Sequence, residues 1–330
     1  MAELPRFIST ADVPAKYLAD VKLVGSVPFK ALKSEPRTSY TLYIPPEHYN
    51  PDPSRQLLLK DDKTNTDLDP IYHLPPLPLL VNIHGTSRSA ERCRNSLEEF
   101  SHKERVAILA PLFPAGIDGY NHLENYQLLN YKALRFDLAL LSMLDEVALR
   151  WPGIATQKVY LMGFSAGGQF VHRFMYLHSD RLLAASVGAP GAVTLLDKSL
   201  TWPRGIRNLS EVFGADAVVD IPSLKQLPIQ LVVGSADNFV YGAEGFWKWV
   251  SEKKTKLANE QDEVKGSAPK LASEPRKGRW DSLADLQLTL RKDGIPTTLN
   301  VVEGVKHDSM GVLSAVQSFF RPLLQTMPRG

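Results

Sequence analysis

Short runs that are apolar at nearly every position alternate with longer helical patterns along most of the 330 residues. Strands of a sheet covered by helices on both faces are typically apolar throughout, whereas strands with one wet face alternate apolar and polar residues. The alternation therefore predicts an α/β fold built on a mostly parallel sheet. The expected strands are Val21–Lys30, Thr38–Ile44, Leu77–His84, Val106–Ala110, Lys158–Phe164, Leu182–Val187, Ile229–Gly234 and Thr297–Val302.

Four helices are expected between and after these strands: Ser89–Lys103, Leu134–Trp151, Ala166–His178 and Val312–Leu324. We predict that helices lie on both faces of the sheet, since neither face of the apolar strands can stay in water. The first two strands are close in sequence, and we expect them to form an antiparallel hairpin at one edge.

Composition excludes several classes of protein. Hydrophobic residues make up 44% of the chain, which is enough for a sizeable core. A net charge of +2 does not favour a nucleic-acid partner, and one cysteine, Cys93, excludes an intrachain disulfide or a cysteine zinc cluster. No apolar run is long enough to span a membrane, and residues 1–10 lack the apolar core of a signal peptide. We expect a single domain over residues 1–330 and a location in the cytoplasm. The sequence leaves open whether the chain forms a homo-oligomer.

Three stretches depart from this alternation. Residues 48–76 are rich in proline and aspartate, which predicts an exposed loop, and the other two bear on the domain organisation. Residues 192–227 combine a Trp202-Pro203 turn with short apolar pieces, and we predict a small cap over a pocket. Residues 251–280 are rich in lysine and glutamate and poor in large apolar residues, which is typical of a flexible, solvated insertion. The alternative for this last stretch is a docking surface for an acidic partner.

The strongest local signal is Gly163-Phe164-Ser165-Ala166-Gly167-Gly168, at the junction of an expected strand and an expected helix. A Gly-x-Ser-x-Gly pattern in that position is typical of a nucleophile elbow, in which the serine occupies a sharp turn. Glycines are needed there because side chains would collide with the neighbouring strand and helix. The helix N-terminus also supplies free N–H groups beside Ser165.

A serine hydroxyl needs a base, and the base needs an orienting acid. Asp237 follows the expected strand 229–234, and His307 follows the expected strand 297–302, which gives the chain order Ser, Asp, His. Both would lie at the carboxyl edge of a parallel sheet, where such sheets carry their sites. Other residues remain alternatives for the acid: Asp216, Asp220 and Asp308.

The turn His84-Gly85-Thr86 directly follows the third expected strand. We predict that Gly85 lets the backbone turn sharply, so that the N–H of Thr86 faces the pocket. The N–H of Ala166 would be the second donor of an oxyanion hole. Such a site requires neither a metal nor an organic cofactor.

Substrate contacts are expected from four residues near these groups: His84, Gly85, Phe239 and Tyr241. The last two belong to an aromatic cluster after Asp237, which would either line an apolar pocket or pack a helix onto the sheet. Arg88 would either bind a substrate carboxylate or face solvent.

On the elbow, the His-Gly-Thr turn and the order of the three catalytic candidates, the chain resembles the α/β-hydrolase superfamily. Its motifs are most similar to those of polyhydroxybutyrate depolymerases and feruloyl-esterase-like serine esterases. The resemblance covers nearly the whole chain. It implies a mostly parallel eight-stranded sheet with Ser165, Asp237 and His307 as catalytic residues. The chain differs from those enzymes in two ways. They are often disulfide-bonded, which this chain cannot be internally, and its 251–280 insertion is longer than usual.

These observations predict a serine hydrolase that cleaves a carboxylic ester or lactone of a small apolar or aromatic molecule through an acyl-enzyme. An acyltransferase or cyclase of a secondary-metabolite pathway is the alternative on the same residues, because acyl transfer competes with hydrolysis when water is excluded. A scaffold that has lost activity is disfavoured by the intact serine, aspartate and histidine.

Overall fold

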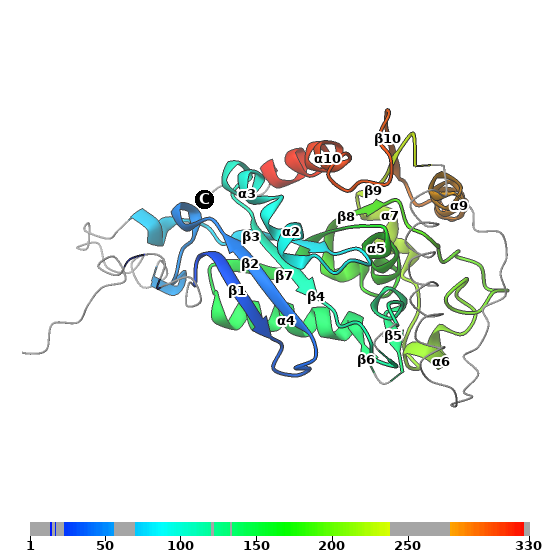
Figure 1. Cartoon of the computed structure of the whole chain (residues 1–330), viewed down its shortest axis with the longest axis horizontal. Helices are drawn as coiled ribbons and strands as arrows, with labels where there is room; N and C mark the ends of the chain where they lie inside the picture. Colours follow the sequence, from blue (N-terminus) through cyan, green and yellow to red (C-terminus); the bar gives the residue numbers. More distant parts are fainter. Residues whose placement is uncertain are drawn as a thin grey trace, which may run out of the picture.

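The computed structural model describes residues 14, 17, 23–55, 70–119, 122–132, 134–237 and 278–326. Within these residues one eight-stranded sheet has the order β1-β2-β4-β3-β7-β8-β9-β10 (Figure 1). Strand β2 is antiparallel to β1 and β4, and every other neighbouring pair is parallel. The predicted mostly parallel sheet and the edge hairpin are confirmed. The strands are β1 Gly25–Ala31, β2 Ser39–Ile44, β3 Leu77–Ile83, β4 Ala107–Leu112, β7 Ile154–Phe164, β8 Leu182–Gly188, β9 Ile229–Gly234 and β10 Thr298–Val302.

Helices cover both faces of this sheet, as predicted. Strands β5 (Asn130–Tyr131) and β6 (Leu134–Arg135) form a separate short hairpin. Short 3₁₀ turns occupy 46–48, 70–73, 126–128 and 179–181. The helices are α2 Ala90–Asn95, α3 Glu98–Glu104, α4 Phe136–Arg150, α5 Ala166–Leu177, α6 Leu209–Phe213, α7 Ile221–Gln226, α9 Arg279–Lys292 and α10 Leu313–Gln325.

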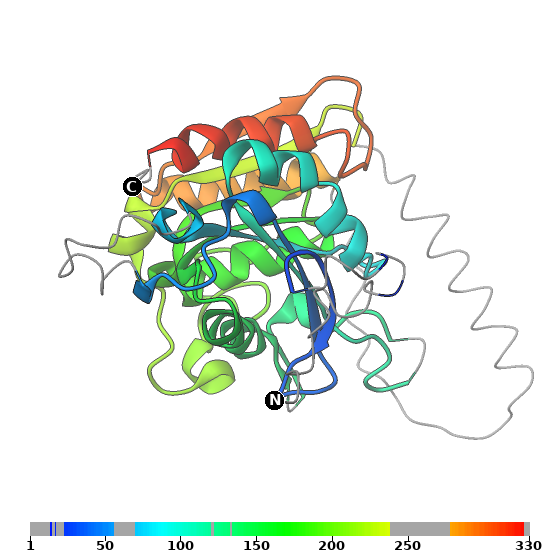
Figure 2. The same cartoon turned by 90° about the vertical axis from the view of Figure 1, so that its left-hand side faces the viewer.

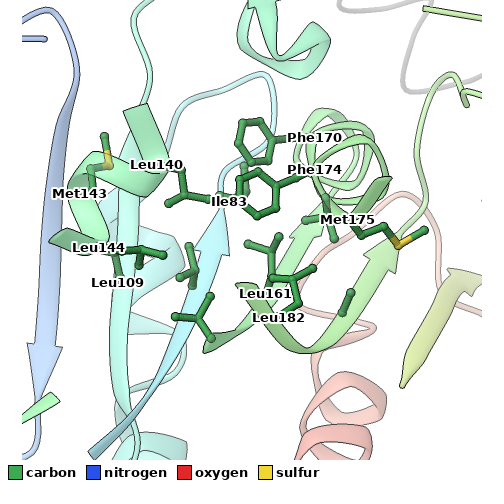
Figure 3. Close-up of a cluster of buried hydrophobic side chains, with 14 of the residues drawn as sticks. Ile83, Leu109, Leu140, Met143, Leu144, Leu161, Phe170, Phe174, Met175 and Leu182 are labelled. Carbon is green, nitrogen blue, oxygen red and sulfur yellow. The ribbon is translucent and has the colours of Figure 1, made fainter. Parts of the chain in front are cut away.

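Alternate residues of the central strands enter two separate hydrophobic clusters. In β7, Val159 and Leu161 join the cluster with α4 and α5, while Tyr160 and Met162 join the cluster with α3 and α10. Figure 3 shows side chains of α4 and α5 meeting strand residues such as Leu161. In Figure 2, α10 (red) lies beside α3 (cyan) on one side of the sheet. The strands are apolar at successive positions because successive side chains enter different cores.

Three expected boundaries are wrong. Strand β1 begins at Gly25 rather than Val21. The predicted helix 89–103 is two helices, α2 and α3, separated at Ser96 and Leu97. The break lets Leu97 and Phe100 reach the α10 cluster while α2 stays against β2 and β4. Strand β7 begins at Ile154 rather than Lys158, because its first residues pair with Leu77 and Pro78 of β3.

Two of the stretches that interrupt the sequence pattern differ in how much of them the structure describes. Residues 192–227 contain α6 and α7, and Trp202 packs against the larger core while its indole N–H donates to the carbonyl of Leu128. Residues 278–280 start α9, whereas the rest of the predicted 251–280 insertion lies outside the described residues. Whether 192–227 acts as a cap stays a prediction.

The carboxyl ends of the parallel strands meet along one edge of the sheet. The loops after β3, β7, β8, β9 and β10 therefore gather there, and they carry the candidate site residues. None of the helices in the described ranges is long and apolar enough to cross a membrane.

Candidate active site

Ser165 lies between the end of β7 and the start of α5, with φ 60° and ψ −117°. A positive φ is strained for a residue with a side chain, so the surrounding structure must hold this conformation in place. The N–H of Ser165 donates to the carbonyl of Gly188 on β8 at 2.8 Å. The strained turn follows the strand directly and leaves Ser165 partly exposed.

The glycines of the elbow are required by close backbone contacts. A Cβ on Gly163 would lie 2.6 Å from the backbone of Gly167, and one on Gly167 would lie 2.3 Å from the carbonyl oxygen of Ile83. Separations this short do not occur between real atoms, so a side chain would force the elbow and β3 apart. The predicted reason for the glycines is thus found in the structure, and it also places the end of β3 against the elbow.

The acid and base candidates are in contact. His307 Nδ1 lies 2.8 Å from Asp237 Oδ2. The side chain of Asp237 is 3% exposed and that of His307 is 29% exposed. An ionised carboxylate only accepts hydrogen bonds, so the proton of the neutral imidazole is on Nδ1. The Nε2 atom is then left with a free lone pair, as a general base requires.

Direct packing between two loops brings this pair together. The N–H of Ala236 donates to the carbonyl of Val305 at 3.0 Å, and the Oγ of Ser235 accepts from the N–H of Gly304 at 2.8 Å. The ring of His307 lies 4.8 Å, between centroids, from the ring of Phe164. Because Phe164 immediately precedes Ser165, this contact places the acid–base pair beside the elbow.

The loop between β3 and α2, residues 84–89, passes close to Ser165. A Cβ built on Gly85 would be 3.9 Å from the Cβ of Ser165. A hydrogen-bonded turn begins at Gly85, which does not have a positive φ; the left-handed residue here is Arg88, with φ 56°. That this turn aims the Thr86 N–H at the pocket stays a prediction. The carbonyl of Gly85 accepts from the N–H of Arg88 at 3.0 Å and lies 2.9 Å from His84 Nδ1.

His84 is fully buried, and its ring is hydrogen-bonded to the backbone of this loop. The N–H of Phe113 donates to His84 Nε2 at 3.1 Å, so the ring proton is on Nδ1 and is donated to the Gly85 carbonyl. Burial lowers the pKa of His84 to about 4, which keeps the ring neutral. In a trans peptide the C=O and N–H point in opposite directions, so the Thr86 N–H points away from the His84 ring.

Arg88 braces the loop rather than facing solvent. Its guanidinium donates to the carbonyls of Thr86 at 2.9 Å and Leu123 at 2.7 Å, and it lies 5.3 Å above the ring of Tyr126. Further bonds, between 3.2 and 3.3 Å, reach Phe113, Pro114 and Asn125. Because its guanidinium is held by five protein acceptors, the expected solvent-facing role is wrong, and binding of a substrate carboxylate by Arg88 stays a prediction.

The remaining predicted residues fall in three groups. His84 has no exposed surface to offer a substrate. Phe239 and Tyr241 lie outside the described residues. Two of the three alternative acids have other partners: Asp220 caps α7 through the N–H of Ser223, and Asp308 accepts from the N–H of Met310.

The sequence did not predict the residues that hold the β3–α2 loop in place. The hydroxyl of Tyr126 donates to the carbonyl of His84 at 2.7 Å, and Asn125 accepts from Arg88. These residues belong to no motif, and only the chain's three-dimensional course brings them to the β3–α2 loop. In the parts of the chain that the structure describes, no group of three or more His, Cys, Asp or Glu side chains could hold a metal ion.

Comparison with known proteins supports the fold. No protein-family model matches the chain, and no curated protein matches its sequence. Among solved structures it is similar to poly(aspartic acid) hydrolase-1 from Sphingomonas sp. KT-1, with a TM-score of 0.59, 19% identity and coverage of 89% of this chain and 97% of that one. It is also similar to a poly(3-hydroxybutyrate) depolymerase from Bordetella parapertussis (TM-score 0.56, 20% identity, 88% and 85% covered). A ferulic acid esterase gives a TM-score of 0.52 at 14% identity, with 90% and 96% covered. Together with the strand order, these likenesses show that the chain has the α/β-hydrolase fold.

Proposed function

We propose that this protein is a serine hydrolase that cleaves a carboxylic ester or lactone of a small apolar or aromatic molecule. The observation that carries the proposal is the 2.8 Å contact between His307 Nδ1 and the buried carboxylate of Asp237, beside a serine in the strained elbow conformation. Nucleophile, base and orienting acid come from three separate loops at one edge of the sheet. Packing of the core does not explain why a serine, a histidine and an aspartate meet at a partly exposed position, whereas catalysis does.

The mechanism follows from the positions of these groups. His307 Nε2 removes the proton of Ser165 as its Oγ attacks the acyl carbon, and Asp237 stabilises the imidazolium that forms. The N–H groups of Thr86 and Ala166 donate to the oxyanion, and each such donor contributes about 3 kcal/mol of transition-state stabilisation. The imidazolium then protonates the leaving oxygen. Water, deprotonated by the same histidine, attacks the acyl-enzyme and releases the acid.

Two features support the N–H assignment. Ala166 is the first residue of α5, and the first N–H groups of a helix have no acceptor within it. Thr86 follows a carbonyl held by both His84 and Arg88, so its peptide plane is fixed before a substrate binds. A donor that is already oriented adds no reorganisation cost in the transition state.

Exposure of the base supports hydrolysis over acyl transfer or cyclisation. The His307 side chain is 29% exposed, so water can reach the atom that must activate it. A transferase or cyclase has to keep water away from the acyl-enzyme, which would otherwise be hydrolysed.

The first test is hydrolysis of 4-nitrophenyl acetate by the wild type, Ser165→Ala and His307→Ala. We expect both variants to lose about 10⁴-fold or more in kcat, because neither residue works without the other. Ser199→Ala, which removes an exposed hydroxyl that donates to Asp197 and to no other described residue, is the matched control and should keep wild-type activity. A Ser165→Ala protein that keeps wild-type turnover would overturn the proposal.

A further inference from the structure

A cavity of about 780 Å³ lies beside the candidate site, on the β1 side of the sheet. Its lining includes Arg88, which ends the turn after Thr86, and Met310, three residues after His307. From there it extends along α2, through Ser89 and Arg92, to Phe29 on β1. The cavity is thus bordered by the loops that carry a predicted oxyanion donor and the predicted base.

Part of the cavity wall is apolar and exposed. Phe29 is 43% exposed and Met310 is 40% exposed, and Leu112 at the end of β4 belongs to the same lining. Large apolar side chains left in water at one cavity, contributed by opposite ends of the chain, are typical of a surface that binds another molecule.

The wall formed by α2 is held rigidly. The buried guanidinium of Arg94 donates to Thr41 Oγ1 at 2.6 Å and to the carbonyl of Val27 at 3.2 Å, which ties the helix to β1 and β2. At the other end of the wall, Arg88 ties the preceding loop to residues 113–125. The part of the wall formed by α2 and the loop before it is therefore ordered without a ligand.

One cation of this wall has no ion-pair partner among the residues that the structure describes. Arg88 is used by backbone carbonyls, and Glu91 forms an ion pair with Arg94 at 3.3 Å. Arg92 is exposed, lines the cavity and forms no ion pair with any described residue. The cavity therefore combines apolar surface with a free positive charge.

We propose that this cavity binds the leaving-group side of the substrate, and that this side has an apolar or aromatic body ending in a carboxylate paired with Arg92. The inference rests on the proposed function and adds a substrate class to it. The leaving group belongs here because His307 must protonate the leaving oxygen, and Met310 belongs to the same loop as His307. Phe29, Leu112 and Met310 would contact the apolar body.

Two acetyl esters test this assignment directly. One has 3-(4-hydroxyphenyl)propanoate as its leaving group, and the other has the corresponding carboxamide, which has nearly the same shape but no charge. We expect the wild type to show a kcat/KM about threefold to fivefold higher for the carboxylate ester, mostly through KM, which is the size typical of a partly exposed ion pair. Added salt should reduce this ratio.

Four variants locate the effect. Arg92→Gln should bring the ratio of the two kcat/KM values close to one, and Arg92→Lys should retain part of it. Lys103→Gln removes an exposed cation of α3 that does not line the cavity, and it should keep the wild-type ratio. Met310→Ser should raise KM for both esters alike, because it removes apolar contact and not charge.

A wild-type ratio of one, or a ratio that survives Arg92→Gln, would overturn the assignment of the cavity. Failure of the proposed function is recognised separately, by absence of fluorophosphonate labelling at Ser165. Labelling that persists together with a ratio of one would reject the carboxylate site and leave the hydrolase intact.

Discussion

Replacing Gly167 with alanine tests how the elbow and the β3–α2 loop are held together. The new Cβ would lie 2.3 Å from the carbonyl oxygen of Ile83 and 2.9 Å from that of His84. Both neighbours are backbone atoms, so neither can rotate away. Ordinary van der Waals contact begins at 3.4 Å, so α5 and the end of β3 must separate by about 1 Å.

That displacement affects both stability and catalysis. Overpacking of this kind costs about 1–3 kcal/mol of unfolding free energy. The same movement shifts the Thr86 N–H relative to Ser165, and a displacement of about 1 Å at a catalytic group costs roughly 10²-fold in rate. We therefore expect Gly167→Ala to be folded but less stable, with kcat for 4-nitrophenyl acetate reduced about 10²-fold to 10³-fold.

Gly85→Ala is the matched control for stability. Its Cβ would meet nothing closer than 3.6 Å, and Gly85 does not have a positive φ, so alanine should not lower the unfolding free energy. Urea unfolding followed by circular dichroism, with kcat measured on the same preparations, checks both quantities. Gly167→Ala with wild-type stability and wild-type kcat would refute this account of the elbow.

Three further predictions concern the acid, the brace and pH. Asp237→Asn should lower kcat/KM by about 10³-fold to 10⁴-fold, less than Ser165→Ala, because an amide does not stabilise the imidazolium; near-wild-type turnover would move the acid to another residue. Arg88→Met should lower kcat by about 10²-fold with a smaller change in KM, since the loop loses its ties to residues 113–125; an unchanged kcat would contradict the bracing role. Burial lowers the pKa of His84 to about 4 and holds that of His172 well below its usual 6.5. The unfolded chain therefore binds more protons than the folded one below pH 6.5, and unfolding free energy should fall as pH drops from 6.5 to 4, by about 3 kcal/mol from His84 alone. Urea unfolding at several pH values checks this, and a flat profile would contradict it.

The sheet could be predicted from the sequence because its strands are buried on both faces. Runs such as 79–81 and 159–162 are apolar at successive positions because each side chain enters one of two cores. The elbow could be predicted for a related reason, since Gly163 and Gly167 occupy positions where backbone atoms leave no room for a Cβ. Both signals are local, and so a single sequence contains them.

The roles of the surrounding residues could not be predicted in the same way. The left-handed turn falls on Arg88 rather than Gly85, and the five acceptors of Arg88 lie between two and 37 positions away in the chain. Likewise, the cavity is assembled from β1, α2 and the loop after β10. Long-range contacts of this kind leave no periodic or motif signal in the sequence.

Covalent labelling with a fluorophosphonate, read by intact mass, tests most directly whether Ser165 is an activated nucleophile. The account predicts one adduct on the wild type, located at Ser165 by peptide mapping, and none on Ser165→Ala. It also predicts much slower labelling of His307→Ala, which keeps the serine but loses its base. A folded wild-type protein that forms no adduct, or an adduct that persists on Ser165→Ala, would contradict it.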